Sequence, residues 1–258
     1  MIRLKTKEEL LIMREAGKIV SQALDALREV VRPGVSTADL ERVVETHIVD
    51  SGGKSAFKGY YPSYAPHPYP GAVCVSVNGE VVHGIPSGGR ILEEGDIVSV
   101  DVGVYLKGYY GDAACTYPVG KIDSNREKLL KATEKSLELA IAASVKGNTV
   151  GDIGYAVESY IQANGFSVIR DYTGHGIGKK LHEAPQIPNF GQRKRGVTLQ
   201  QGMTLAIEPM VAAGKEDVML GSDGWVVVTA DGSDAAHFER TIVITDDGPE
   251  ILTPWISL

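Results

Sequence analysis

Four acidic residues stand in or beside apolar segments of this chain, where an unpaired carboxylate would be costly to bury. Asp101 lies within the run VSVDVG, and Asp112 follows eleven residues later. Glu208 interrupts LAIEPMV, and Glu239 lies in AHFERTIVI. Asp112 alone would be interpreted as part of a surface turn. Four such acids on one sheet, however, would repel one another unless a cation lay between them, so the pattern predicts a metal site.

A histidine in a glycine-rich segment supplies the remaining ligand of the predicted site. His175 lies in TGHGIG, where the glycines allow close approach of the backbone. A lone histidine is more often structural, but this one accompanies four carboxylates, and imidazole is a common metal ligand. Such a ligand set suits Mn, Fe, Co or Zn, and bridging carboxylates hold pairs of these ions in hydrolases. We therefore predict a two-metal hydrolytic centre formed by Asp101, Asp112, His175, Glu208 and Glu239.

Alternating blocks of helical and strand patterns must position these side chains. Helices are expected from a cap at Thr6 to before Pro33, from a cap at Ser36 to before Gly52, from a cap at Ser124 to about residue 145, and over residues 150–163. Short β-branched runs between turn residues predict strands at 72–77, 80–83, 97–103, 113–119, 205–211, 225–229 and 241–245.

The order of elements, helices then strands, occurs twice. Asp39 and Asp152 stand 113 residues apart in similar helical patterns, while Asp101 and Glu208 stand 107 residues apart, each after a turn and an apolar run. Any two amphipathic helices align at some shift, but the strand match ends on an acid in both halves. We predict one α+β domain over residues 1–258 with related halves of about 1–120 and 121–258, a curved and mainly antiparallel sheet, and helices on one face.

Composition limits the setting and the partners. The formal net charge of −7 disfavours nucleic acid or an anionic membrane as a partner. The basic run at residues 193–195 is interpreted as a solvated loop rather than a polyanion contact. No apolar stretch is long enough for a membrane span or a signal peptide, and two cysteines are too few for a disulfide framework, so a cytoplasmic location is expected.

Six motifs, in order along essentially the whole chain, carry a close resemblance to a known family. HGIP at 83–86, DVG to GD over 101–112, GHGIG at 174–178, HEAP at 182–185, AIEPM at 206–210 and FERT at 238–241 resemble type I methionine aminopeptidases. The resemblance implies the pita-bread (creatinase/aminopeptidase) fold. It also implies removal of the initiator methionine from nascent proteins with a small second residue. The chain resembles the short bacterial form, with a monomer as the default and ribosome contact, through residues 193–195, as a weak expectation.

The resemblance also assigns roles within the metal site. Asp101 would bind one ion, His175 and Glu208 would bind the other, and Asp112 and Glu239 would bridge them. A water between the ions would attack the peptide bond, with Glu208 as the proton shuttle.

Two further histidines and a pocket follow from the same resemblance. His182 would donate a hydrogen bond to the scissile carbonyl oxygen and His83 one to the neighbouring amide. The methionine side chain would contact Tyr60, Tyr69, Cys74 and Trp225, although these could equally be ordinary core residues. Four features depart from the family pattern, namely Phe57 and Leu181 in the pocket, an insertion at 61–68, and His237 and Arg240 around Glu239.

Two rival interpretations remain. Aminopeptidase P and prolidase share the fold but normally carry an extra N-terminal domain, for which this chain has no room. A catalytically inactive binding module is the other, but such proteins lose ligands, and this chain keeps all five together with both auxiliary histidines.

Overall fold

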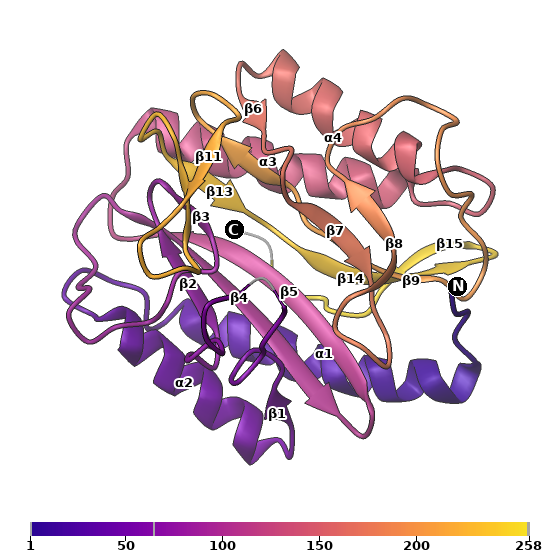
Figure 1. Cartoon of the computed structure of the whole chain (residues 1–258), viewed down its shortest axis with the longest axis horizontal. Coiled ribbons are helices and arrows are strands. Elements are labelled where there is room, and N and C mark those ends of the chain that lie inside the picture. Colours follow the sequence, from indigo (N-terminus) through magenta and orange to yellow (C-terminus); the bar gives the residue numbers. More distant parts are fainter. Residues whose placement is uncertain (1, 64, 257–258) are drawn as a thin grey trace.

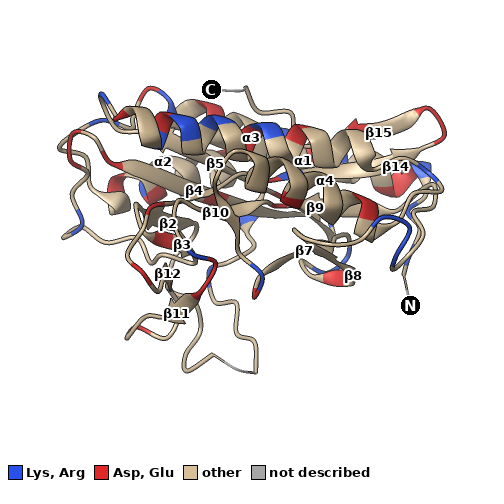
Figure 2. Cartoon of the chain, turned by 90° about the horizontal axis from the view of Figure 1, so that it is seen from above, with Lys and Arg blue, Asp and Glu red and all other residues tan. Residues whose placement is uncertain are grey.

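The helices lie together over one face of the strands (Figure 2). The computed structural model describes residues 2–63 and 65–256. Its helices are α1 (Lys7–Leu27), α2 (Thr37–Asp50), α3 (Ser124–Ala143) and α4 (Val150–Ala163). Each corresponds to a helix predicted from the sequence. Within the described ranges, no helix is both long and apolar enough to cross a membrane.

Side-chain hydrogen bonds set where the helices begin. Thr6 and Glu9 form the predicted capping box of α1, and Ser36 forms that of α2 with Asp39. The prediction of Ser124 as the third cap is wrong, by one residue. Asp123 is the cap instead, because its carboxylate accepts hydrogen bonds from the backbone N–H groups of residues 125 and 126.

Between the described strands, every pairing is antiparallel. The strands of the first half are β1 (Lys54–Ser55), β2 (Cys74–Val77), β3 (Glu80–Val82), β4 (Ile97–Leu106) and β5 (Tyr109–Pro118). Those of the second half are β6 (Ser167–Val168), β7 (Thr173–Gly176), β8 (Glu183–Pro188), β9 (Thr204–Ile207), β10 (Met210–Ala212), β11 (Val218–Leu220), β12 (Val227–Thr229), β13 (Ala235–His237), β14 (Arg240–Thr245) and β15 (Gly248–Ile251). The predicted α+β class, with helices on one face of mainly antiparallel strands, is confirmed.

The described strands form four hydrogen-bonded groups, and the group of β4 and β5 lies beside that of β14 and β9 across the middle of the molecule (Figure 1). One group pairs β1, β2 and β5 with β4, and the largest runs in the order β15-β14-β9-β7-β8. A backbone pair joins these two groups, since the N–H of Glu239 donates to Ala114 O at 2.9 Å and the N–H of Ala114 donates back at 3.4 Å. An acidic residue, Glu239, therefore lies at the junction between the two halves.

Matched elements support the predicted division into two halves. Helices α2 and α4 each have 14 residues and begin 113 positions apart, at 37 and 150. The isolated bridge between Ser36 and Ile91 has a counterpart between Thr149 and Thr198, at shifts of 113 and 107. The domain boundaries themselves stay a prediction.

Helix α1 lies unusually close to the strand that carries Asp112. A Cβ atom added to Gly111 would lie 3.0 Å from the backbone nitrogen of Gly17 in α1, and one added to Gly17 would lie 2.0 Å from Leu252 O. Only glycine permits this approach. The contact places helix α1 directly behind the acidic residues and closes the site on that side.

Candidate metal centre

A row of side chains crosses the sheet at the middle of β4. Cys74 of β2 pairs with Asp101 of β4, which pairs with Ala114 of β5, and the backbone bonds of Ala114 continue the row to Glu239. Residues directly opposite one another on paired strands point to the same face. Register alone therefore brings Asp101 and Glu239 together, although 138 positions (239 − 101) separate them in the sequence.

Asp112 joins the row from one step along β5. It pairs with Gly103, which lies two residues beyond Asp101 and so on the same face. Asp112 and Glu239 are 3% and 2% exposed, respectively. One oxygen of Asp101, of Asp112 and of Glu239 is buried without a hydrogen-bond partner among the residues that the structure describes. Buried oxygens in this state are rare in folded proteins and call for a ligand.

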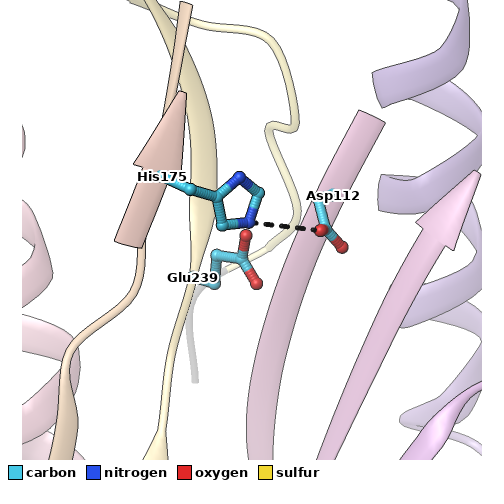
Figure 3. A group of neighbouring side chains, drawn as sticks. All are labelled: Asp112, His175 and Glu239. Atoms are coloured by element: carbon cyan, nitrogen blue, oxygen red, sulfur yellow. Dashed lines mark ion pairs between the residues drawn. The ribbon is translucent and has the colours of Figure 1, made fainter. Parts of the chain in front are cut away.

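His175 faces the acids across the junction (Figure 3). Its Nδ1–H donates to Gly176 O at 2.9 Å, which leaves Nε2 as the free lone pair. Nε2 lies 3.8 Å from Asp112 Oδ2 and 3.6 Å from Glu208 Oε1. An irregularity in the pairing of β7 with β8 falls between residues 175 and 176 and aims the ring inward.

Glu208 lies in a break between two strands. The sequence predicts a strand over 205–211 that is irregular or at an edge at Pro209, which cannot donate to a ladder. The structure has this irregularity, since β9 ends at Ile207 and β10 begins at Met210. The break turns the Glu208 side chain toward the junction while β9 stays paired with β7 and β14.

Burial dominates the electrostatics of this cluster. It raises the pKa of Asp101 to about 7, and it raises the pKa of Asp112, with further contributions from neighbouring carboxylates. The pKa values of Glu208 and Glu239 are also raised by burial. Burial lowers the pKa of His175 to about 3, so its imidazole is neutral at pH 7. Mutually repelling carboxylates beside a neutral imidazole form a favourable site for divalent cations.

The donor atoms fall into two sets that share one residue. Asp112, His175 and Glu239 each offer an atom within 4.8 Å of the others, and so do Glu208, His237 and Glu239. Asp101 lies outside both sets but faces the same cavity. The shared position of Glu239 fits the predicted bridging role, which stays a prediction together with the other ligand roles.

One cavity of about 650 Å³ brings together every site residue predicted from the sequence. These are Tyr60, Tyr69, Cys74, His83, Asp101, Asp112, His175, His182, Glu208, Trp225 and Glu239. The predicted pocket residues also belong to a hydrophobic cluster separate from the main core, where Phe57 and Leu181 accompany them. The cavity is thus lined by the acidic cluster in one part and by apolar and aromatic side chains in another.

His83 reaches the cavity from a strained backbone position. Its φ of 62° is unusual for a residue other than glycine. The next residue is clamped to β2, because Gly84 O accepts from Val75 N at 2.8 Å and Tyr69 Oη–H donates to the same oxygen at 2.7 Å. The His83 ring packs edge-on against Trp225 and Tyr172, and burial lowers its pKa to about 4. Strain held by surrounding bonds is typical of functional positions.

His182 lies beside His175 and Tyr60. Its ring centroid is 4.4 Å from that of His175, and its Nδ1 lies 3.1 Å from the Tyr60 hydroxyl. Burial lowers the pKa of His182, so the ring is neutral at pH 7. The two auxiliary histidines, His83 and His182, therefore line the same cavity as the acids and are neutral hydrogen-bonding groups.

The predicted insertion at 61–68, of which residue 64 lies outside the described residues, is attached to the pocket wall. Trp225 Nε1–H donates to His67 O at 3.2 Å, and His67 Nε2 lies 3.1 Å from Asp223 O. Pro66 packs against Gly224 so closely that an added Cβ there would lie 2.4 Å from its ring. The insertion therefore packs against Gly224 and Trp225, which line the cavity.

Several cavity residues carry no sequence signal that identifies them as such. Tyr172 adjoins the TGHGIG motif, and strand β11 contributes Met219 and Leu220, which are 53% and 63% exposed at the mouth.

His237 shows the same signal as the acids, a polar residue in an apolar strand, and the structure places it inside the cavity.

Comparison with known proteins places this fold and site in a class. A model of metallopeptidase family M24 matches residues 12–246. The chain therefore belongs to metallopeptidase family M24, whose members are hydrolases that use divalent metal ions.

Individual relatives show which members of that family the chain resembles. The chain is 48% identical to a methionine aminopeptidase of Clostridium acetobutylicum and to methionine aminopeptidase 1 of Bacillus subtilis, covering 98% of this chain and 99% of each relative. It is 43% identical to the methionine aminopeptidase of Escherichia coli K12, covering 94% of that protein. The resemblance predicted from the motifs is confirmed.

Solved structures agree. The methionine aminopeptidase of Thermotoga maritima superposes with a TM-score of 0.95 at 49% identity, covering 98% of this chain and 99% of the other. An Xaa-Pro dipeptidase of Bacillus anthracis has a TM-score of 0.78 at 24% identity, and 63% of its length is matched. The second likeness shows the fold alone.

Binding of a divalent ion is expected to release protons near pH 6. The carboxyl of Asp101, with a pKa of about 7, is mostly protonated there in the metal-free fold, and the ion displaces that proton. Because the metal-free state binds more protons than the loaded state, the apparent metal affinity should rise from about pH 5 to about pH 8. Calorimetric titration in two buffers of different ionisation enthalpy measures the protons released. The Asp101→Asn variant should release fewer, and zero release by the unmodified chain would contradict the raised pKa.

Glu183→Ala is expected to destabilise the segment that carries His182. Lys5 Nζ lies 2.7 Å from Glu183 Oε2, with side chains only 3% and 14% exposed, and the other Glu183 oxygen accepts from the N–H groups of Lys179 and Lys180. Removing one partner leaves the Lys5 charge buried and unpaired, which costs about 3–5 kcal/mol. Denaturant unfolding measures the loss.

The matched control for this pair is the double variant Lys5→Met/Glu183→Gln, which has no buried charge and should lose less than Glu183→Ala. A loss below about 1 kcal/mol for Glu183→Ala would show that the pair is solvated and does not hold the segment.

Proposed function

We propose that the chain removes the N-terminal methionine from nascent polypeptides by metal-dependent hydrolysis and favours a small second residue. One observation carries the proposal: the cluster of carboxylates and imidazoles opens onto a pocket lined by Tyr69, Cys74 and Trp225. The pocket is apolar and polarizable and therefore suits a thioether side chain. The preference for a small second residue comes from the resemblance in motifs.

The proposed cofactor is a pair of divalent ions, of Co, Mn, Fe or Zn. Asp112 and Glu239 would bridge the pair, with Asp101 on one side and His175 and Glu208 on the other. The orphaned buried oxygens and the lone pair of His175 Nε2 support this donor set. When bound, such ions act as Lewis acids and lower the pKa of coordinated water.

Glu208 is the proposed proton carrier between the attacking water and the leaving amine. Its carboxyl lies at the edge of the cluster, 13% exposed at the side chain, while its backbone oxygen is held by Asn189 Nδ2 at 2.9 Å. Burial raises its pKa, so it can carry a proton between the two steps of peptide hydrolysis. It accepts a proton from the attacking water and delivers it to the leaving amine.

His182 and His83 bind the peptide. In this role the neutral His182 ring carries its proton on Nε2, and the Tyr60 hydroxyl, 3.1 Å from Nδ1, is the donor to that nitrogen. The Nε2–H would then donate a hydrogen bond to the scissile carbonyl oxygen as charge develops. His83, fixed through Gly84 and Trp225, hydrogen-bonds the adjacent amide. Both roles need neutral rings, as their lowered pKa values provide.

A peptide panel tests the proposed function. Metal-free protein is loaded in turn with Mn, Co, Fe or Zn and incubated with Met-Ala-Ser, with Ala-Pro peptides and with Leu peptides. We expect metal-dependent release of methionine from Met-Ala-Ser and little cleavage of the others. Cleavage of the Ala-Pro peptides instead would assign the chain to the Xaa-Pro peptidases, and no cleavage with any metal would support an inactive binding module.

Ribosome contact at residues 193–195 stays a prediction. These residues form an exposed turn, in which the Arg193 guanidinium stacks on Tyr155 of α4 and Lys194 N–H donates to Asp152 Oδ1. The monomeric state and the cytoplasmic location stay predictions as well.

A further inference from the structure

A second imidazole, that of His237, lies in the acidic cluster and is not one of the five predicted ligands. The His237 side chain is 2% exposed, and its Nε2 lies 3.6 Å from Glu208 Oε2 and 4.0 Å from Glu239 Oε2. Within the described part of the chain, this nitrogen has no hydrogen-bond partner. A buried ring nitrogen without a partner is costly, and it points at two carboxylates that belong to the site.

The backbone of His237 is held on both sides, so the point from which its side chain enters the cluster is set before any ligand binds. Thr116 Oγ1 accepts from the N–H of His237 at 2.9 Å and donates to its carbonyl oxygen at 2.8 Å. Ser99 Oγ lies 2.8 Å from the same Thr116 oxygen and can donate to it. The pairing of His237 with Met210 fixes it against β10 as well. Ligands prearranged in this way are a general feature of metal sites.

The distances distinguish shared coordination from hydrogen bonding. A separation of 3.6 Å is too long for a hydrogen bond to a carboxylate. Two ligand atoms that are each about 2.1 Å from one ion, at a tetrahedral or wider angle, lie about 3.4–4.2 Å apart. Both separations at His237 Nε2 lie within that range.

We propose that His237 is a metal ligand, which together with Glu208 and Glu239 coordinates the ion that His175 and Glu208 are proposed to hold. The inference rests on the proposed function, because it takes the cluster to hold metal. With His237 as a ligand, the metal centre contains two imidazoles instead of one. Imidazole favours Zn, Co and Fe over Mn, so the chain should prefer these ions more strongly than a single-imidazole site would.

The alternative is that His237 acts only through a hydrogen bond that orients Glu208. Metal affinity alone does not separate the two, because the loss of an orienting residue also weakens binding by about 10–100-fold. A direct readout of the nitrogen–metal bond is therefore required.

Nuclear magnetic resonance of the metal-loaded chain provides that readout. The chain has only six histidines, so ¹⁵N-labelled imidazoles can be followed individually in the presence of ¹¹³Cd²⁺. We expect one-bond ¹¹³Cd–¹⁵N couplings at two histidines, His175 and His237. In His237→Gln, which keeps a polar side chain of similar reach, only the coupling at His175 should remain. His47→Gln, on α2, is the matched control and should keep both.

Each outcome is decisive. Coupling at His175 alone in the unmodified chain would overturn the role of His237 and leave the proposed function intact. No coupling at any histidine would overturn this inference and the metal dependence together. Zn²⁺ titration gives a second readout, in which His237→Gln should lose at least about 10-fold in Zn²⁺ affinity and less in Mn²⁺ affinity. Equal losses for both ions would contradict ligation by imidazole.

Discussion

Glu239→Gln is expected to lower kcat by about 10³-fold or more while the chain stays folded. Glu239 belongs to both donor sets, so an amide in its place weakens the whole centre, and loss of metal activation costs several kcal/mol of transition-state stabilisation. The metal-free protein should keep its stability or gain some, because a buried carboxyl that repels Asp112 and Glu208 is replaced by a neutral group. Steady-state kinetics and denaturant unfolding of the metal-free form measure the two effects.

The matched control is Glu15→Gln, which removes the same charge from an exposed residue of α1 that pairs with Lys107. It should leave both kcat and metal binding unchanged. If Glu239→Gln retained near-normal turnover with two bound ions, the bridging role would be wrong.

His182→Ala is expected to lower kcat by about 10²–10³-fold with little change in KM. In its proposed role, the Nε2–H of His182 donates to the carbonyl oxygen as negative charge develops there, so the interaction would be stronger in the transition state than in the bound substrate. Kinetics on Met-Ala-Ser with the metal-saturated variant measure the effect, and metal content checks that the centre is intact.

Tyr60→Phe is the companion variant for this test. It removes the hydroxyl that faces His182 Nδ1 but keeps the ring in the pocket, so kcat should fall much less, by about 10-fold. A rise in KM with kcat unchanged for His182→Ala would contradict this role. It would indicate that the histidine stabilises the bound substrate and the transition state equally and does not act on the developing charge.

The acidic cluster could be predicted from the sequence because its signal is local. A carboxylate within an apolar strand is costly, and the chain repeats this feature at Asp101, Glu208 and Glu239. The proline after Glu208 likewise predicted an irregular strand, and the structure shows β9 and β10 separated there. Capping residues predicted where the helices begin, with one cap misassigned by one residue, to Ser124 in place of Asp123.

Other parts of the site depend on register and packing, which a single sequence does not state. The row from Cys74 to Glu239 exists because β2, β4 and β5 pair in one register and because the Ala114–Glu239 backbone pair closes the junction. In the sequence, His237 is only a departure from the family pattern near Glu239. The structure shows that its Nε2 points at Glu208 and Glu239. The attachment of His67 to Trp225 depends in the same way on the meeting of two distant loops.

The most direct test of the central claim is the anomalous difference map of crystals grown with Mn²⁺. We expect strong peaks inside the cavity, within coordinating distance of Asp112, His175, Glu208 and Glu239, with Glu239 contacting both ions. Metal-dependent release of methionine from the same preparation would accompany them. An active, Mn²⁺-dependent preparation whose crystals show no anomalous peak among these side chains would contradict the assignment of the metal centre.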